Sequence, residues 1–124
     1  MFDHLSLGVR SLARSGAFYD RVLAPLGISK LHDSAGALGY GRNRIGLWFG
    51  ETASPVPADP SSGLHVCFDP PDRAAVAAFH RAALAHGGTD NGPPGIRADY
   101  APDYYAAFVI DPDGYRLEAY CRDA

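Results

Sequence analysis

The sequence contains two similar halves, in which corresponding residues lie 61 positions apart. After a longer loop in the second half the spacing becomes 72, which aligns Gly46 with Glu118. Self-similarity at a fixed spacing indicates repeated structural units, although coincidence among common Ala, Leu and Gly residues is the alternative. The matches are Asp3-His4-Leu5 with Leu64-His65-Val66, Ala17-Phe18 with Ala78-Phe79, Leu23-Ala24 with Leu84-Ala85, Gly27 with Gly88, and Arg44-Ile45-Gly46 with Arg116-Leu117-Glu118.

Each half shows the same order of secondary-structure signals. Alternating polar and apolar residues predict strands, and apolar residues at three- and four-residue steps predict a helix. In the first half these are a strand at 2–9, a helix through 17–23, and strands at 28–32, 37–40 and 44–49. In the second half they are a strand at 64–68, a helix at 73–85, a weakly marked middle strand, and strands at 104–110 and 115–121.

This order predicts an α+β fold made of two βαβββ modules. The modules, about 1–50 and 63–122, are joined by a Pro/Ser-rich connector at 51–62 within a single domain at 1–124. Side chains alternate between the two faces of a strand, so the apolar face packs under the helix. We therefore expect a cupped mixed sheet with the helices outside and a concave face lined by the remaining side chains.

Three side chains on that concave face form a candidate metal site. His4 and His65 occupy equivalent places in the two halves, and Glu118 alternates with the apolar residues Leu117 and Ala119. Two imidazoles and one carboxylate suit Fe(II), Mn(II), Ni(II) or Zn(II) and leave positions open for a substrate. The sequence thus predicts one divalent metal bound by His4, His65 and Glu118, with Glu118 also a candidate catalytic base.

Aromatic and basic residues supply candidates for substrate binding. Pairing across the turn Asp111–Gly114 places Tyr105 on the concave face near Tyr120, which makes Tyr105 a second catalytic candidate. Trp48 alternates with Leu47 and Phe49, and Arg97 and Tyr100 lie in a long loop at 91–103 that is a candidate lid. Plain packing and a Pro-stiffened surface loop are the alternatives. The predicted substrate-binding residues are Trp48, Arg97, Tyr100, Tyr105 and Tyr120.

Composition excludes several classes of partner. The chain has 124 residues, a net charge of −3 and no Lys/Arg block, so nucleic acid is not an expected partner. No apolar run approaches the ~20 residues of a membrane span. The N-terminus lacks the pattern of a secretion signal, so we expect a cytoplasmic protein. Cys67 and Cys121 are then reduced thiols, and we expect Cys67, in an apolar run, to be buried.

The sequence resembles the vicinal oxygen chelate superfamily, which holds glyoxalase I, extradiol dioxygenases, and fosfomycin- and bleomycin-resistance proteins. The resemblance covers nearly the whole chain. It implies that His4, His65 and Glu118 bind a metal that acts as a Lewis acid on a small substrate. Its carriers are His4, Phe18-Tyr19-Asp20, Leu23, Gly27, Gly63-Leu64-His65-Val66 and Asp111-Pro112-Asp113-Gly114-Tyr115-Arg116-Leu117-Glu118.

The resemblance leaves three functions open. The first is a metal-dependent glyoxalase-like lyase, isomerase or transferase that stabilises an enolate or oxyanion. The second is an extradiol-type Fe(II) dioxygenase, and the third is a non-catalytic drug-binding protein of the bleomycin-resistance type. Glyoxalase I has a fourth ligand in the first half, where this spacing places Gly46. The resemblance also implies a homodimer, in which the two halves pair within one chain or across two chains.

Overall fold

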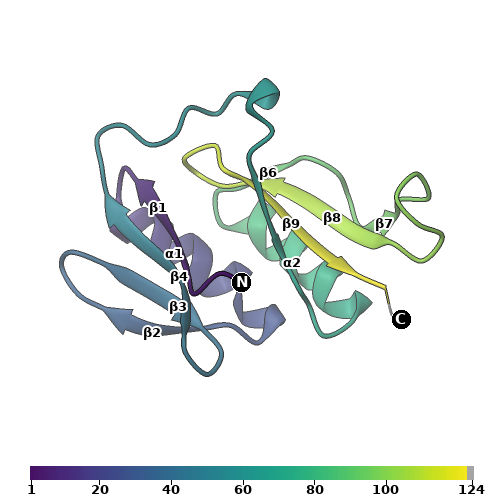
Figure 1. The fold of residues 1–124 in the computed structure, drawn as a ribbon, viewed down its shortest axis with the longest axis horizontal. Coiled ribbons are helices and arrows are strands. Elements are labelled where there is room, and N and C mark those ends of the chain that lie inside the picture. The colour runs from purple at the N-terminus through teal and green to yellow at the C-terminus, as the bar shows by residue number, and fades with distance from the viewer. Residues whose placement is uncertain (123–124) are drawn as a thin grey trace.

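The computed structural model describes residues 1–122, and its first half forms a four-stranded sheet. The strand order is β1-β4-β3-β2, with β1 parallel to β4 and the other pairs antiparallel. Ser11 caps the helix α1 by accepting a hydrogen bond from the backbone of Arg14. The elements are β1 (Leu5–Val9), α1 (Leu12–Val22), a 3-10 turn at Ala24–Leu26, β2 (Ser29–Asp33), β3 (Leu38–Gly41) and β4 (Ile45–Glu51) (Figure 1).

The second half repeats this arrangement, with the short strand β6 in the place of β2 and one further short strand, β7. The sheet order is β5-β9-β8-β6, and β7 pairs with β8 beside that path. Asp72 caps the helix α2 through the backbone of Ala75. The elements are a 3-10 turn at Pro60–Ser62, β5 (His65–Phe68), α2 (Arg73–Ala85), β6 (Thr89–Asp90), β7 (Gly95–Ile96), β8 (Tyr105–Ile110) and β9 (Arg116–Cys121).

The two helices cover one face of the two sheets. Figure 1 shows α1 behind the first sheet and α2 behind the second, and the helices also contact each other. One hydrophobic core runs through both halves and includes Phe18, Tyr19, Phe49, Phe79 and Leu117. The opposite face of each sheet, which we call the open face, carries no helix. The α+β class, the βαβββ pattern and the outer helices predicted from the sequence are therefore confirmed.

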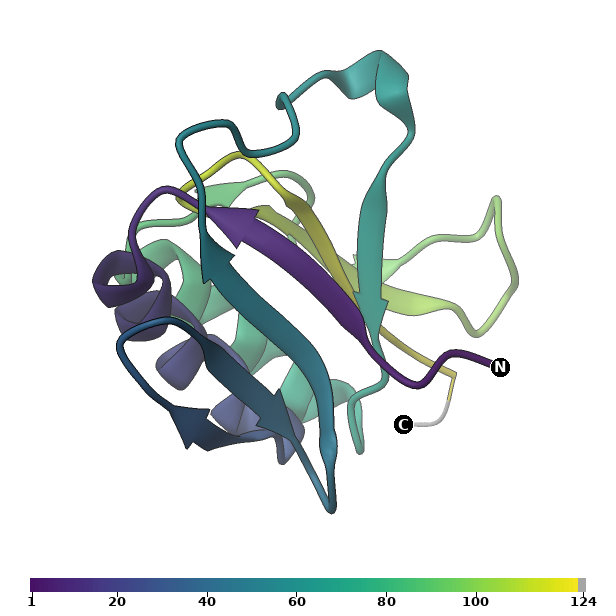
Figure 2. The same ribbon diagram turned by 60° about the vertical axis from the view of Figure 1, so that its left-hand side comes forward.

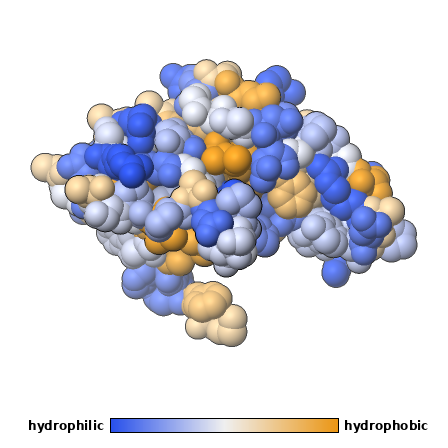
Figure 3. Space-filling view, turned by 90° about the horizontal axis from the view of Figure 1, so that it is seen from above, coloured by the Kyte–Doolittle hydropathy of each residue, from blue (hydrophilic) through white to orange (hydrophobic). Residues whose placement is uncertain are grey.

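The edge strands β1 and β5 face each other across the middle of the molecule (Figure 2). Each is the terminal strand of its own sheet, and together they line a cleft of about 470 Å³. Phe2, Leu5 and Leu64 at this cleft are exposed. On the face seen from above, hydrophobic side chains gather in separate small patches between hydrophilic ones (Figure 3). No helix within residues 1–122 is long and apolar enough to span a bilayer.

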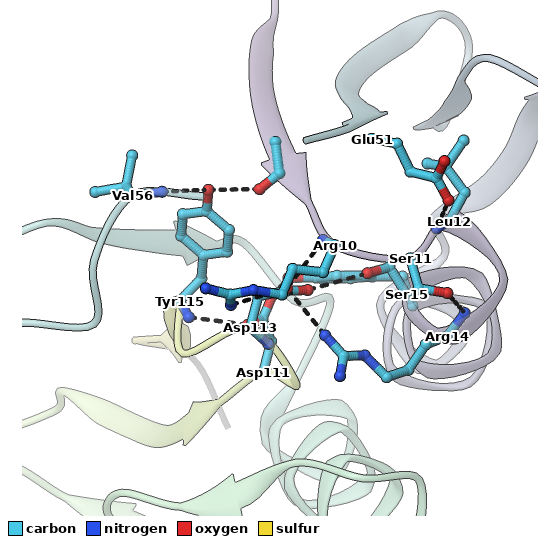
Figure 4. Close-up of polar contacts among 12 residues, drawn as sticks. Arg10, Ser11, Leu12, Arg14, Ser15, Glu51, Val56, Asp111, Asp113 and Tyr115 are labelled. Carbon is cyan, nitrogen blue, oxygen red and sulfur yellow. Dashed lines mark hydrogen bonds and ion pairs between the residues drawn. The ribbon is translucent and has the colours of Figure 1, made fainter. Parts of the chain in front are cut away.

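Buried polar contacts join the β8–β9 turn to the start of the first half (Figure 4). Asp111 accepts a hydrogen bond of 2.5 Å from the Tyr19 hydroxyl, and burial raises the pKa of this carboxyl group. Asp113 accepts hydrogen bonds from the Arg14 guanidinium at 2.9 Å and from the Arg10 backbone at 3.0 Å. The two aspartates, predicted only as turn residues, therefore also hold the two halves together.

The same turn sets the register between β8 and β9. The Asp111 side chain accepts hydrogen bonds from the backbones of Asp113 and Tyr115, and Gly114 has a φ of 96°. The pairing is therefore Phe108 with Glu118 and Val109 with Leu117. The sequence-based prediction placed the turn at Asp111–Gly114, but the connection runs from Asp111 to Tyr115, so the predicted register is wrong by one residue. A slip of one residue moves every side chain of a strand to the other face.

Candidate functional site

Glu118 is a buried carboxylate on the open face of the second sheet. It lies on β9 between Leu117 and Ala119, which pack in the core, so alternation turns its side chain away from the helices. Only 3% of the residue is exposed. Its Oε1 atom lies 3.0 Å from His65 Nε2, and its Oε2 atom accepts a hydrogen bond from the Tyr104 hydroxyl. Both carboxylate oxygens therefore have polar partners.

His65 begins β5, the strand next to β9 in the same sheet. Its residue partner across the parallel pair is Arg116, and Cys67 is the partner of Glu118. The His65 side chain is half exposed, which leaves it open to a ligand from the surface. The structure therefore brings together His65 and Glu118, two of the three residues predicted as metal ligands.

The spacing of these two ligands fits a shared metal ion. Two ligands with bond lengths near 2.1 Å lie about 3 Å apart when their bonds meet at close to a right angle. The observed distance of 3.0 Å between His65 Nε2 and Glu118 Oε1 matches this spacing. A cation there would also neutralise the buried charge of Glu118. The residues of the second half thus fit one edge of a divalent metal site.

His4 lies just before β1 and does not join this pair. Its Nδ1 atom is 2.8 Å from the Asp3 carboxylate, and nearly half of its side chain is exposed. His4 and His65 line the same cleft between β1 and β5. However, within the 122 residues described here, no three His, Cys, Asp or Glu side chains lie close enough to hold a metal ion. A single chain therefore does not assemble the predicted set of three ligands.

A cavity of about 700 Å³ opens beside His65 and Glu118. One wall comes from the start of β5 and from β9, and the other comes from the middle of β8, from Asn91 just after β6 and from the loop between β7 and β8. This volume is typical of a site for a small organic molecule. The lining residues are Gly63, Leu64, His65, Asn91, Asp99, Tyr100, Tyr104, Phe108, Arg116 and Glu118.

Tyr104 connects the aromatic side of this cavity to Glu118. Its ring stacks on Tyr120 with centroids 3.6 Å apart and an angle of 11°. The Tyr100 ring packs against it in a T-shaped arrangement with centroids 5.0 Å apart. Burial, together with the hydrogen bond to Glu118 and its charge, raises the pKa of Tyr104. The hydroxyl therefore stays protonated at neutral pH and donates to the carboxylate. Sequence reasoning chose Tyr105, because it assumed a β8–β9 turn that is one residue shorter than the observed connection.

The other predicted substrate-binding residues have different positions. Tyr105 faces the helix side, packs against the core and lies 5.0 Å below the Arg73 guanidinium, so its predicted place on the open face is wrong. Arg97 donates to the Pro93 carbonyl and covers the Phe108 ring, which braces the loop from within. Tyr100 lines the cavity, as expected, and Tyr120 lies beneath Tyr104.

Trp48 lies on the open face of the first sheet, as alternation predicted. It is half buried, and its ring is 5.2 Å from the His32 ring. In the first half Ser6 pairs with Trp48, and in the second half Cys67 pairs with Glu118. Trp48 therefore occupies the place that Glu118 has in the second half. The alignment of Glu118 with Gly46 from residue spacing is wrong, because the strand register shifts it by two residues.

Cys67 shares the open face with His65 and Glu118. We expected Cys67 to be buried, but the residue is exposed. It alternates with Val66 and Phe68, which pack on the core side, so its own side chain lies on the opposite face. Its thiol nevertheless lies toward Glu118. Partial burial of the thiol and the neighbouring carboxylate raise the pKa of Cys67 to about 12. Cys67 is therefore a neutral thiol at physiological pH.

Comparisons with known proteins agree with this fold. No model of a known protein family matches the chain, and no curated protein does. Among solved structures, a glyoxalase/bleomycin resistance protein from Albidiferax ferrireducens is 33% identical over 97% of this chain and 98% of its own, with a TM-score of 0.82. A glyoxalase-related enzyme from Fulvimarina pelagi is 20% identical over 97% and 86% of the two chains, with a TM-score of 0.74.

A third similar structure contains a metal and a small molecule. It is a mutant of the fosfomycin resistance protein FosX from Listeria monocytogenes, complexed with Mn(II) and dihydroxypropylphosphonic acid. It is 16% identical to this chain and has a TM-score of 0.72, over 97% of this chain and 88% of its own. At that identity the likeness concerns the fold alone. The match to the Albidiferax protein over nearly its full length is closer, and the chain therefore belongs to the vicinal oxygen chelate superfamily.

Proposed function

We propose that this protein is a metal-dependent enzyme that acts on a small, oxygen-bearing molecule, with lyase, isomerase or transferase chemistry of the glyoxalase type. The observation that supports this proposal is the pair His65 and Glu118, whose donor atoms lie 3.0 Å apart at the edge of a cavity of about 700 Å³. A divalent cation held there would supply Lewis acidity toward substrate oxygens.

The residues around this pair have separate roles in the proposal. His65 and Glu118 hold the cation, and Glu118 is also within reach of a substrate proton as a base. Tyr104 donates to Glu118 Oε2 and so keeps the opposite oxygen, Oε1, turned toward His65. Leu64, Tyr100 and Phe108 line the cavity around the substrate and reduce its contact with water. Tyr105, on the helix side, has no role in this proposal.

The third ligand, His4, would come from a second copy of the chain. Because one chain does not bring His4 to His65 and Glu118, a homodimer in which the first half of one copy meets the second half of the other would complete the set. Exposed apolar residues around His4, Phe2 and Leu5 among them, support a contact at this edge. Each dimer would then hold two equivalent sites.

Mixing two inactive variants tests this arrangement. His4→Ala and His65→Ala are each expected to lose the metal, measured by elemental analysis of protein purified without a metal-affinity tag. If the variants are mixed, unfolded and refolded together, half of the dimers are mixed, and one of the two sites in each is intact. About a quarter of the wild-type metal content should return. If each site belongs to one chain, mixing restores nothing.

Two assays on the wild-type protein distinguish the alternative functions from our proposal. Turnover of catechols by the Fe(II)-loaded protein would favour the dioxygenase. Absence of stoichiometric metal from wild-type protein, with tight binding of an aromatic drug, would favour the sequestering protein and contradict our proposal. The stacked Tyr104 and Tyr120 rings and the adjacent Tyr100 ring are the features that a drug-binding role would use.

A further inference from the structure

Arg116 lies in the candidate cavity, beside the two proposed metal ligands. It is the first residue of β9, two positions before Glu118, and its partner across the parallel pair with β5 is His65. Alternation places Arg116 and Glu118 on the same open face, with their backbones about 7 Å apart. Its side chain lines the same cavity as His65 and Glu118. One small ligand could therefore contact both the Arg116 guanidinium and the proposed metal.

The guanidinium of Arg116 has no hydrogen bond or salt bridge to any residue in 1–122, whereas several other arginines do. Arg14 binds Asp113, Arg44 binds Asp3, and Arg97 donates to Pro93. Asp59 in the connector is near enough to Arg116 for the guanidinium charge to help lower the pKa of its carboxyl group. Its Oδ1 atom already accepts from the backbone and hydroxyl of Ser61, and these hydrogen bonds are the main cause of its lowered pKa.

The rest of the cavity limits what this cation can bind. Arg116 is the only Lys or Arg among the lining residues, and the two acids Asp99 and Glu118 share the same space. A group with one negative charge balances a single guanidinium, while a dianionic phosphonate would need further cations. The rings of Tyr100, Tyr104 and Phe108 favour an apolar or aromatic body on the ligand.

We propose that Arg116 determines substrate specificity by binding a carboxylate group of the substrate, separate from the oxygens that face His65 and Glu118. The substrate class is then an apolar or aromatic monocarboxylate that carries a second oxygen function. The position of that second function rests on the proposed metal site. The carboxylate subsite itself rests only on Arg116 and the cavity, so the two can fail separately.

Binding of three related compounds tests the subsite. The probes are 3-phenylpropanoate, its uncharged amide 3-phenylpropanamide, and 2-phenylethylphosphonate, titrated calorimetrically at millimolar concentration into the protein as purified and after removal of metal by EDTA. The variants are Arg116→Gln, Arg116→Lys and, as a matched control, Arg81→Gln on the exposed side of α2. Elemental analysis of each variant reports the metal independently.

Wild-type protein should bind the acid about tenfold or more tightly than the amide, with or without metal. Arg116→Gln should abolish this preference and keep the wild-type metal content, Arg116→Lys should keep part of the preference, and Arg81→Gln should keep all of it. The subsite would be overturned if the preference for the acid survived in Arg116→Gln or disappeared after EDTA treatment. It would also be overturned if the phosphonate bound more tightly than the acid, or if the acid did not bind. If wild-type protein as purified contains no stoichiometric metal but still prefers the acid to the amide, only the proposed function would be overturned.

Discussion

The two halves of the chain share a backbone frame but place different chemistry at the same position. Trp48 in the first half and Glu118 in the second pair with equivalent residues of β1 and β5, yet one is an indole and the other a buried carboxylate. His4 and His65 are the same residue type at matching positions. The two halves therefore share their sheet geometry, while only the second half has a carboxylate at this position.

The difference explains why we expect three ligands and not four. A repeat with a carboxylate in both halves would place two negative charges on facing sheets, which is stable only around a cation. Trp48 replaces one of these charges, so the proposed shared site would contain two histidines and one carboxylate. This set leaves more positions open for substrate oxygens.

The largest expected effect is on metal affinity and comes from removing the Glu118 carboxylate. Glu118→Gln keeps the shape of the side chain but removes its charge, and we expect metal affinity to fall by about 100-fold or more. Metal content and the dissociation constant for Mn(II) measure the effect. Trp48→Phe is the control at the equivalent position and should keep the metal. Equal losses in both variants would contradict the assignment of Glu118.

The next effect concerns the contacts that hold the halves together. Asp113→Ala removes a carboxylate whose side chain is inaccessible to solvent and which binds Arg14 and the Arg10 backbone. We expect the free energy of unfolding to fall by about 2–4 kcal/mol, measured by urea denaturation. Arg42 also joins the halves, by an exposed ion pair with Asp69 and by hydrogen bonds to the Leu26 and Asp69 carbonyls, and Arg42→Ala should cost less than Asp113→Ala, about 1 kcal/mol. A larger loss in Arg42→Ala would show that the contacts of Arg42 contribute more to the association of the halves than those of Asp113.

Tyr104→Phe should have a smaller effect, and only on the second half. The variant keeps the stacked ring and removes the hydroxyl that donates to Glu118. Metal affinity or turnover should fall by about tenfold, while the unfolding midpoint stays near that of the wild type. Tyr105→Phe is the adjacent control. If Tyr105→Phe reduces metal affinity and Tyr104→Phe does not, the register of β8 against β9 is wrong.

The smallest effect is a change in thiol reactivity. Partial burial and the Glu118 carboxylate hold the pKa of Cys67 at about 12, so little thiolate exists at pH 8, and alkylation should speed up as the pH rises toward that value. Glu118→Gln removes the negative charge, lowers this pKa and should raise the rate of iodoacetamide reaction at pH 8 several-fold. The measurement uses a Cys121→Ser background. An unchanged rate would indicate that the thiol and carboxylate do not interact.

Part of the candidate site followed from alternation alone. His65 begins a strand whose Val66 and Phe68 face the core, and Glu118 lies between the buried residues Leu117 and Ala119. Their shared face was therefore predictable from local sequence. The role of Tyr104 was not, because it depends on a five-residue connection in which Asp111 binds the backbone of Tyr115. The Asp111 side chain, typical of such a turn, was the signal that could have indicated it.

The sequence by itself determined the repeat, the α+β class, the order of the main elements and the face on which strand residues such as His65, Trp48 and Glu118 lie. These follow from local periodicity, which acts over a few residues along the chain. Tertiary structure alone decided that Tyr104 and not Tyr105 meets Glu118, that Trp48 is the counterpart of Glu118, and that His4 stays with Asp3. These depend on register and on the approach of separate strands, which are set by packing between distant segments.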